Sequence, residues 1–287
     1  MSGNSEMGAC RLDRDAVLKG VRSLPSLPTV VVELLQSIDD DDADTQELAE
    51  KLARDQALAA KVLRVANSSF YGLQGKVESI GDAIVVLGLQ GLRTLATAAA
   101  VTGTFAAGGE GAHDLRSFWR HSVAVALCAK EIARQRHMNE GNAFAAGLLH
   151  DIGRLALAAC FPRHVAAVAA EREAHDDSLL AAERRLLGID HAEIGQMLTE
   201  YWRFPTILSQ AIGTHHVPDA TAAPLAAVIH VADAVAHALD LAGEASTQVP
   251  PLDEAAWRHV GLGDAAWLEL FEHVETQFSA ACESLVS

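Results

Sequence analysis

Apolar residues recur at helical spacing along almost the whole chain, and no other feature restricts the fold as strongly. In residues 30–38, 79–87, 115–135 and 222–239 apolar positions fall three and four apart, so each segment would present one apolar face as a helix. Alternation typical of strands does not persist, apart from an ambiguous run at residues 30–32. Half of the residues are hydrophobic but only 5% are aromatic, so the core must be mainly aliphatic. We therefore predict an all-α fold.

Local signals predict where several helices begin and end. Asp44, with Glu47 three positions later, is typical of a helix start, and Asp55 is expected to cap the next short helix. Gly88 is expected to end the helix that precedes it. The glycine-rich residues 106–113 are the best candidate for a hinge between two halves. A length of 287 residues fits one large domain or two small ones.

The chain is acidic, which restricts its partners. It carries 38 acidic and 22 basic residues, a formal net charge of −16, and part of the acidity lies in a run at residues 39–42 that we expect to be a solvated turn. Nucleic-acid backbones are recognised by clustered Lys and Arg, so no nucleic acid is expected as a partner. A helix-turn-helix in residues 47–66 is the alternative. Its modest basic face consists of Lys51, Arg54, Lys61 and Arg64.

The cysteines and the N-terminus indicate the compartment. The four cysteines form no C-x-x-C pair, which disfavours a thiolate zinc site and a disulfide framework and suits reduced thiols. Residues 1–11 lack the basic and apolar regions of a signal peptide. The longest uncharged stretch, residues 94–109, is too short and too weakly apolar to span a membrane. We expect a cytoplasmic protein with no membrane partner.

Histidine is unusually frequent, with thirteen residues against four cysteines. Seven histidines and aspartates stand out because they close or interrupt apolar segments, where an uncompensated polar side chain costs free energy. They are His121, His150, Asp151, His191, His215, His216 and Asp233. Imidazole and carboxylate without thiolates suit Fe, Mn, Ni, Zn or Mg, and an aspartate directly after a ligand histidine can bridge two ions. These residues predict a site for one or two divalent metal ions, and no organic cofactor is predicted.

Each of these residues also has an ordinary structural explanation. A histidine at a helix end, such as His215, interacts favourably with the helix dipole, and an aspartate in an apolar helix, such as Asp233, can be a hydrogen-bonded core acid. Spacing alone therefore leaves a metal site and a set of structural groups both open. Surface or structural roles are predicted for the other histidines, which are His113, His137, His164, His175, His230, His237, His259 and His273.

The sequence His150-Asp151-Ile152-Gly153 resembles the HD superfamily of helical metal-dependent phosphohydrolases. The wider sequence resembles the HDOD family, the HD-related output domains of bacterial signalling proteins. The matching motifs run in order through residues 24–28 (LPSLP), 65–72 (VANSSFYG), 79–84, 87–88, 118–122, 146–155, 188–195, 202–205 and 211–216. The chain after residue 239 lies outside the resemblance.

The resemblance implies a fold and a domain organisation. An N-terminal helical subdomain would pack on a C-terminal HD-like helical bundle. The chain would consist of an N-terminal extension (residues 1–23), the N-terminal helical half of the HDOD domain (24–105), the HD-like half (106–240) and a C-terminal helical extension (241–287). The expected partners are other signalling proteins, namely receiver domains, kinases or cyclic-dinucleotide enzymes.

The resemblance also implies roles for the singled-out residues. By analogy with HD enzymes, one metal would be held by His121, His150, Asp151 and Asp233, and a second by a bridging Asp151 with His191, His215 and His216. Arg154 and Arg120 are candidate phosphate contacts, because a guanidinium can hold a phosphate with two hydrogen bonds. Many active relatives carry lysine at the position of Arg154. Residues 217–220 lack the Gly-Tyr-Pro signature, which disfavours hydrolysis of cyclic di-GMP.

Two functions follow. The favoured one is a signal transduction output domain that acts through protein–protein interaction and contains a His/Asp metal site in its HD-like half. Many family members are thought not to be hydrolases, and residues 24–105 resemble no catalytic module. The alternative is a metal-dependent phosphohydrolase that acts on a nucleotide or another phosphoester, with a nucleotide as its ligand.

Overall fold

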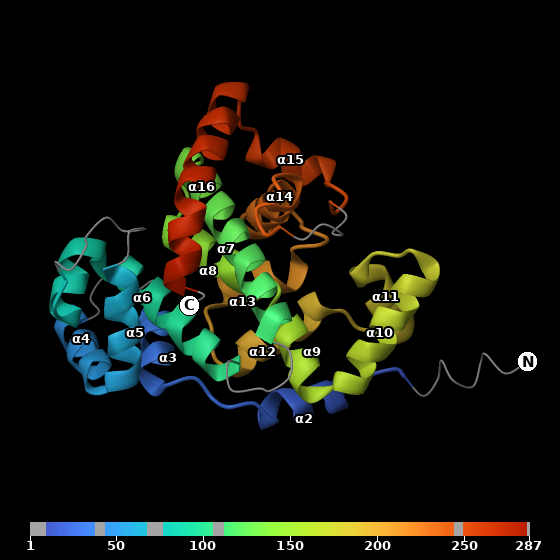
Figure 1. The fold of residues 1–287 in the computed structure, drawn as a ribbon, viewed down its shortest axis with the longest axis horizontal. Helices are drawn as coiled ribbons and strands as arrows, with labels where there is room; N and C mark the ends of the chain where they lie inside the picture. Colours follow the sequence, from blue (N-terminus) through green and yellow to red (C-terminus); the bar gives the residue numbers. More distant parts are fainter. Residues whose placement is uncertain (1–9, 38–43, 68–76, 106–111, 244–248, 286–287) are drawn as a thin grey trace, which may run out of the picture.

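The structure is a computed structural model that describes residues 10–37, 44–67, 77–105, 112–243 and 249–285 (Figure 1). Every regular element in these ranges is a helix, and 78% of the structure is helical, which confirms the all-α prediction. The helices up to residue 105 are α2 (Arg14–Ser23), α3 (Thr29–Gln36), α4 (Thr45–Arg54), α5 (Gln56–Ala66) and α6 (Ile80–Phe105). They are followed by α7 (Ala112–Gln135), α8 (Glu140–Leu149), α9 (Ile152–Cys160), α10 (Pro162–His175), α11 (Leu179–Leu186), α12 (His191–Tyr201), α13 (Thr206–Thr214), α14 (Pro224–Ala238), α15 (Glu254–Val260) and α16 (Asp264–Leu285).

The first helices begin and break at the residues that the sequence indicates. Asp44 caps α4 by accepting hydrogen bonds from the backbone N–H groups of Gln46 and Glu47, each at 3.0 Å. Asp55 caps α5 in the same way, at 3.0 Å. Gly88 interrupts α6 with φ 71° and ψ 170°. This backbone conformation is open to glycine but strained for other residues, so α6 is two helical segments joined at a kink.

Asn67 lies directly after α5 and joins the two ends of the segment that separates α5 from α6. Its side-chain amide donates to the carbonyl oxygen of Val77 at 2.6 Å, and its Oδ1 accepts from the N–H of Val77 at 3.0 Å. One side chain therefore satisfies both backbone groups of Val77 and closes the nine-residue segment 68–76.

Several sequence predictions lie outside the described residues. They concern the acidic turn at residues 39–42, residues 68–72 of the VANSSFYG motif, and residues 106–111 of the expected hinge. α7 begins at Ala112, so the last two residues of that expected hinge are helical.

α7 is the central helix of the second half, where it packs against α8, α14 and α16. Gly147 permits the close approach of α8, because a Cβ there would lie 2.8 Å from the Cα of Ala126 on α7. α9 packs on α12, and α12 packs on α13. The packing brings the ends of α8, α12 and α13 to the sides of α7 and α14.

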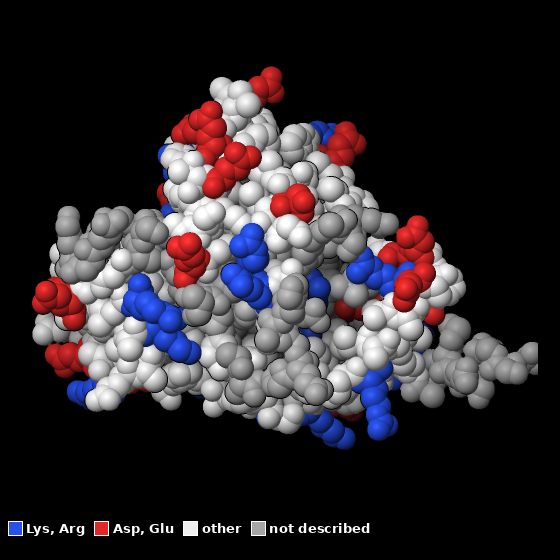
Figure 2. Space-filling model, in the orientation of Figure 1, with Lys and Arg blue, Asp and Glu red and all other residues white. Residues whose placement is uncertain are grey.

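The two terminal segments both contact this bundle. α2 packs on α9 and α12, although it precedes the other helices of the first half. α15 packs on α14, and α16 runs beside α7 and reaches α5 (Figure 1). α16 therefore touches both halves of the molecule. On the face drawn in Figure 2, Lys and Arg side chains are scattered among Asp and Glu.

Two segments, Ile80–Phe105 and Glu140–Cys160, are long and apolar enough to cross a membrane by length and composition. Half of the apolar window in the first and 78% of that in the second are buried inside the structure. The second segment is also divided between α8 and α9. Packing inside a helical core accounts for such composition.

Candidate metal centre

All seven histidines and aspartates singled out in the sequence meet in one place, which we call the His/Asp cluster. His121 lies in α7, His150 and Asp151 join α8 to α9, His191 opens α12, His215 and His216 follow α13, and Asp233 lies in α14. Apart from His216, which is half-buried, each has at most 6% of its surface exposed. Six helices or their ends thus contribute to a site that no short stretch of sequence contains.

Asp151 lies at the centre of the cluster. Its Oδ1 is 3.1 Å from Nε2 of His191, 3.7 Å from Nε2 of His150 and 3.8 Å from Nε2 of His215. Its Oδ2 accepts a hydrogen bond from Arg154 at 2.8 Å. Asp151 belongs to both of the ligand groups that the family analogy assigns to separate ions, so its position suits a bridging carboxylate.

Asp233 forms the second carboxylate position. Its Oδ1 is 3.0 Å from Nε2 of His121 and 3.8 Å from Nε2 of His150. Nδ1 of His237 is 3.1 Å from the same oxygen. His237 was grouped with the surface and structural histidines in the sequence analysis, but it is part of the cluster. The available signal was its position four residues after Asp233, on the same face of one helix.

Backbone carbonyls orient two of the rings. Nδ1 of His150 is 2.8 Å from the carbonyl oxygen of Gly147, and Nδ1 of His215 is 2.7 Å from that of Ile212. A carbonyl oxygen only accepts, so both Nδ1 atoms carry the proton and both Nε2 atoms point to the cluster. Such contacts typically fix the ring of a metal-ligating histidine.

Close packing of α9 and α12 places Asp151 opposite His191. A Cβ on Gly153 would overlap the carbonyl oxygen of His191 and lie 2.7 Å from the backbone nitrogen of Gly195, so this approach requires glycine at position 153. The start of α12 is fixed by a capping box, in which Asp190 accepts from the N–H of the third helical residue at 3.0 Å.

The motifs and this geometry agree with a comparison against protein families. A sequence model of the HDOD domain matches residues 24–218, which is more than half of the chain. This chain belongs to the HDOD domain family. The resemblance seen in the motifs is confirmed, over nearly the range they covered.

Solved structures of the same kind span nearly the whole chain. An HDOD domain protein with unknown function from Geobacter sulfurreducens is 27% identical, with a TM-score of 0.79, and the match covers 95% of this chain and 99% of that one. A protein from Shewanella amazonensis SB2B, provisionally named a phosphohydrolase, is 30% identical, with a TM-score of 0.74 and coverage of 94% and 98%.

A curated relative is more distant and longer. An uncharacterized protein of Treponema pallidum (strain Nichols) is 22% identical over 201 residues, which is 68% of this chain. The chain spans 38% of the length of that relative.

The two aspartates of the His/Asp cluster have pKa values well below the usual value for an aspartate. Burial alone would raise the pKa of Asp151, but His150, His191 and Arg154 hold it well below its usual value. Burial opposes ionisation of Asp233 too, and hydrogen bonds from neighbouring histidines lower its pKa well below the usual value. Both carboxylates are therefore available as anionic ligands at neutral pH.

The histidines differ in charge. Burial lowers the pKa of His150, and burial together with His150 lowers the pKa of His215 to about 4. Both rings are therefore neutral near pH 7 and carry a free electron pair at Nε2. Burial also acts to lower the pKa of His191, but Glu183 and Asp151 outweigh it and raise the pKa to about 10.

Glu183, in α11, is a site residue that the sequence analysis missed. It is 3% exposed, and its Oε2 accepts hydrogen bonds from the backbone N–H of His191 at 2.9 Å and from Nδ1 of His191 at 2.6 Å. These contacts leave Nε2 of His191 facing Asp151. Arg184 and Arg185 follow directly, so the local sequence predicts an exposed, charged segment and does not indicate that Glu183 is buried.

Glu183→Gln is expected to weaken metal binding by about 10–100-fold, the usual effect of changing a partner that orients a ligand histidine. Glutamine keeps the shape and the accepting oxygen but removes the charge that raises the pKa of His191. The pKa of His191 in the metal-free variant should fall. NMR titration of the ring and calorimetric titration with metal measure the two effects. Unchanged values of both would contradict the orienting role.

The cluster fits a divalent metal chemically. Nε2 of His215 is fully buried and has no hydrogen-bond partner among the described residues. Burial of an unsatisfied nitrogen is costly, and ligation to a metal removes that cost. Ligand atoms lie within 4.8 Å of one another in three sets, and all of these atoms are nitrogen or oxygen. The sets are Asp151 with His191, His215 and His216; His121 with His150 and Asp151; and His121 with Asp233 and His237. Cys128 belongs to none of these sets, and burial and the nearby Asp233 raise the pKa of its thiol to about 12.

The two arginines proposed as phosphate contacts lie in different settings. Arg154 borders the cluster, bonded to Asp151 and with 40% of its side chain exposed. The guanidinium of Arg120 instead donates to the carbonyl oxygens of Leu241 at 3.1 Å and Ala242 at 3.3 Å. It also lies 4.9 Å from the ring centroid of Phe278. Arg154 is therefore brought to the cluster, whereas Arg120 binds the chain after α14.

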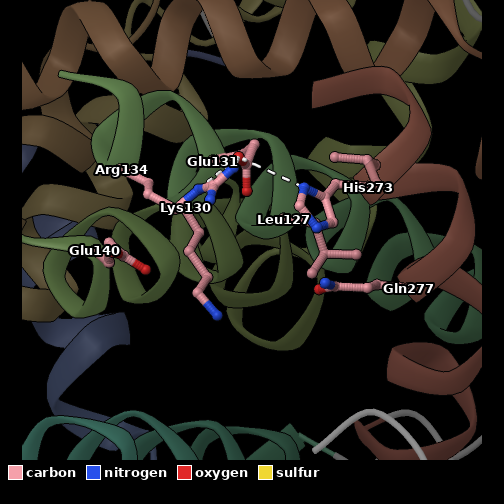
Figure 3. Close-up of a pocket in the computed structure, with 8 residues that line it drawn as sticks. Leu127, Lys130, Glu131, Arg134, Glu140, His273 and Gln277 are labelled. Carbon is pink, nitrogen blue, oxygen red and sulfur yellow. Dashed lines mark hydrogen bonds and ion pairs between the residues drawn. The ribbon is translucent and has the colours of Figure 1, made fainter. Parts of the chain in front are cut away.

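A second group of potential ligands, Glu131, Glu269 and His273, lies between α7 and α16. Glu131 and His273 line a cavity of about 180 Å³ (Figure 3). Arg134 forms ion pairs with both Glu131 and Glu269. Its guanidinium is therefore shared by the two carboxylates, and the group is best described as a salt-bridge network. None of the residues lining the cavity belongs to the His/Asp cluster.

Proposed function

We propose that this HDOD domain is a bacterial signal transduction output module that acts through protein–protein contact in the cytoplasm and holds divalent metal in its His/Asp cluster. The observation that carries the proposal is that the set of ligands is complete but enclosed, with six of the seven residues at most 6% exposed. Catalysis requires a substrate to reach the metal, whereas a structural ion only has to join the helices around it.

The proposal assigns each ligand group to an ion. His121, His150, Asp151 and Asp233 would hold one ion, and Asp151 with His191, His215 and His216 a second. Fe, Mn, Ni, Zn and Mg all suit imidazole and carboxylate ligands. A bound divalent ion would supply positive charge and Lewis acidity at the cluster. The protein would orient the rings of His150, His191 and His215 toward the ion. The Nδ1 atoms of these rings are held by the carbonyl oxygen of Gly147, the carboxylate of Glu183 and the carbonyl oxygen of Ile212, respectively.

Other signalling proteins are the proposed partners, as receiver domains, kinases or cyclic-dinucleotide enzymes. The proposed division into residues 24–105 and 106–240 gives the first half the role of a contact platform, and α16 from the extension 241–287 touches both. The net charge of −16 disfavours nucleic acid. In the helix-turn-helix alternative, Lys51 would also have to leave Glu33 and Glu47, which lie 2.9 and 3.0 Å from its Nζ.

One observation favours a second function, a metal-dependent phosphohydrolase. Arg154 is partly exposed beside Asp151, where its guanidinium has the geometry to hold a phosphate by two hydrogen bonds. The Shewanella protein, 30% identical, carries the provisional name phosphohydrolase. A nucleotide or another phosphoester would be the substrate, bound by Arg154 next to the cluster.

Metal analysis combined with an activity screen separates the two functions. We expect protein purified without chelator to contain about one or two divalent ions per chain by plasma mass spectrometry. No phosphate should be released from a panel of nucleotides, cyclic dinucleotides and simple phosphoesters. Hydrolysis that disappears in both Asp151→Asn and Arg154→Ala would establish the phosphohydrolase instead. Protein that stays metal-free after incubation with each candidate ion would overturn the metal site.

Metal affinity should rise about tenfold per pH unit between roughly pH 7 and pH 9, because His191 must release one proton to ligate. Its pKa is raised to about 10 in the metal-free protein. The stability of the metal-free protein should change in the opposite direction. A raised pKa contributes stability that is complete below the unfolded value of about 6.5 and is lost as pH rises through the folded value. Calorimetric titration at several pH values measures the metal affinity, and chemical unfolding measures the stability. A metal affinity that does not change with pH would contradict the protonated His191.

A further inference from the structure

His230 is a buried histidine whose two ring nitrogens both bind backbone groups. It lies in α14, one turn before Asp233, and is 5% exposed. Its Nδ1 is 2.8 Å from the carbonyl oxygen of His215, and its Nε2 is 2.8 Å from the backbone nitrogen of Asp253. A carbonyl accepts and an amide N–H donates, so Nδ1 carries a proton and Nε2 accepts. The ring therefore joins two backbone positions that are far apart in sequence.

One end of this link is a candidate metal ligand. The ring of His215 faces the cluster with Nε2, while its own carbonyl oxygen accepts from His230. Fixing the ring of His215 on an ion restricts rotation of that residue, and hence the direction of its carbonyl group. The hydrogen bond from His230 carries the restriction into α14.

The other end is the start of the C-terminal helices. Asp253 caps α15, because its Oδ1 accepts from the N–H of Ala256 at 2.8 Å. Trp257 of α15 stacks on Trp267 of α16, with ring centroids 4.8 Å apart and planes 3° from parallel. The position of Asp253 is thereby connected to α16, which packs on α7 and reaches α5.

Arg120 makes a second connection between the cluster and α16. It directly precedes His121 in α7, donates to the backbone after α14 and lies over the ring of Phe278 in α16. A cation over an aromatic face is attracted by the negative charge of the ring face, so this contact holds α16 to α7. α16 is therefore held to α15 near its start, through Trp267, and to the ligand-bearing helix α7 further along, through Phe278.

We propose that His230 is a positioning residue that couples metal loading of the His/Asp cluster to the order of α15 and α16. The inference rests on the proposed metal binding and adds a consequence to it. Bound metal would make the segment from Asp253 through α15 less mobile. A protein that binds and orders α15 and α16 would raise the affinity for metal, and metal would raise the affinity for that protein by the same factor. The enclosed site would thus influence a surface that contacts both halves.

Hydrogen exchange with and without Mn²⁺ tests the coupling on the full chain. We expect Mn²⁺ to slow exchange of the amides in residues 250–263 by about fivefold or more, within the usual range of coupling between sites. His230→Leu removes both hydrogen bonds and should abolish the slowing. His230→Gln is the finer test. Its side-chain amide reaches the position of Nε2, so its carbonyl oxygen can still accept from Asp253, but it places no atom at the position of Nδ1, so the bond to His215 is lost. In this variant α15 should stay ordered and lose only its response to Mn²⁺.

Val228→Ala is the matched control, because Val228 is a fully buried residue of α14 outside the link. It should raise exchange in both states and keep the response to Mn²⁺. Calorimetric titration with Mn²⁺ is run in parallel. Binding without slower exchange in the wild type, or an unchanged response in both His230 variants, would overturn the coupling and leave the metal site standing. No Mn²⁺ binding in the wild type would overturn the metal site for this ion and the coupling with it.

Discussion

Gly153→Ala is expected to unfold about 10 °C below the wild type and to retain no metal. The added Cβ would overlap the carbonyl oxygen of His191 and crowd the backbone nitrogen of Gly195. Overpacking typically costs about 1–3 kcal/mol, and the cost should reach the upper end here because both obstacles are backbone atoms that no rotamer change can move. A loss of about 3 kcal/mol corresponds to roughly 10 °C in a chain of this size. Thermal unfolding and metal analysis measure the two effects.

Gly263→Ala provides the control for that experiment. A Cβ at Gly263 would meet no heavy atom within 4 Å, so the substitution should change stability by less than about 0.5 kcal/mol. If Gly153→Ala were as stable as this control and still bound metal, the close crossing of α9 and α12 would not determine the geometry of the cluster.

Asp151→Asn is expected to reduce metal affinity by more than about a hundredfold. Changing a residue that only hydrogen-bonds to a metal ligand typically lowers metal affinity by about 10–100-fold. Asp151 is itself a member of both ligand groups, so its loss should have a larger effect. The amide has nearly the same shape but lacks the charge that His191 and Arg154 face at 3.1 and 2.8 Å. Removing one partner from a buried set of charges costs about 3–5 kcal/mol, so the metal-free variant should also be less stable.

Asp240→Asn is the appropriate control for this charge change. Asp240 is exposed and has φ 47°, a left-handed conformation that asparagine accepts. Metal binding and stability should both match the wild type. Full metal content in Asp151→Asn, measured beside this control, would show that the central carboxylate is not a ligand.

The parts of the fold that local chemistry determines were predictable from the sequence. Asp44 and Asp55 act on backbone groups two or three residues away, and Gly88 acts on its own backbone, so a short window contains cause and effect. His150 and Asp151 were recognisable for the same reason, because two polar residues stand together at the end of an apolar helix. The distant members of the cluster were singled out by their apolar settings, the family resemblance assigned them to one site, and the structure brings them together.

The parts that depend on contacts between distant segments were not predictable. Glu183 precedes two arginines, and such a charged segment is typical of an exposed helix face. Its burial follows from where α11 lies relative to α12. Arg120 precedes a candidate ligand and was expected to face phosphate, yet its partners are carbonyl groups about 120 residues further along the chain. Only the packing of α7 against the end of α14 reveals that pairing.

Asn67 has a consequence for how such a domain can change over evolution. Its amide fastens both backbone groups of Val77, so the ends of segment 68–76 stay together whatever side chains lie between them. Changes to residues 73–76, which lie outside the family motif at residues 65–72, can therefore leave the packing of α5 and α6 in place. One side-chain amide would let a related chain acquire a new binding specificity there without redesign of the helices that support it.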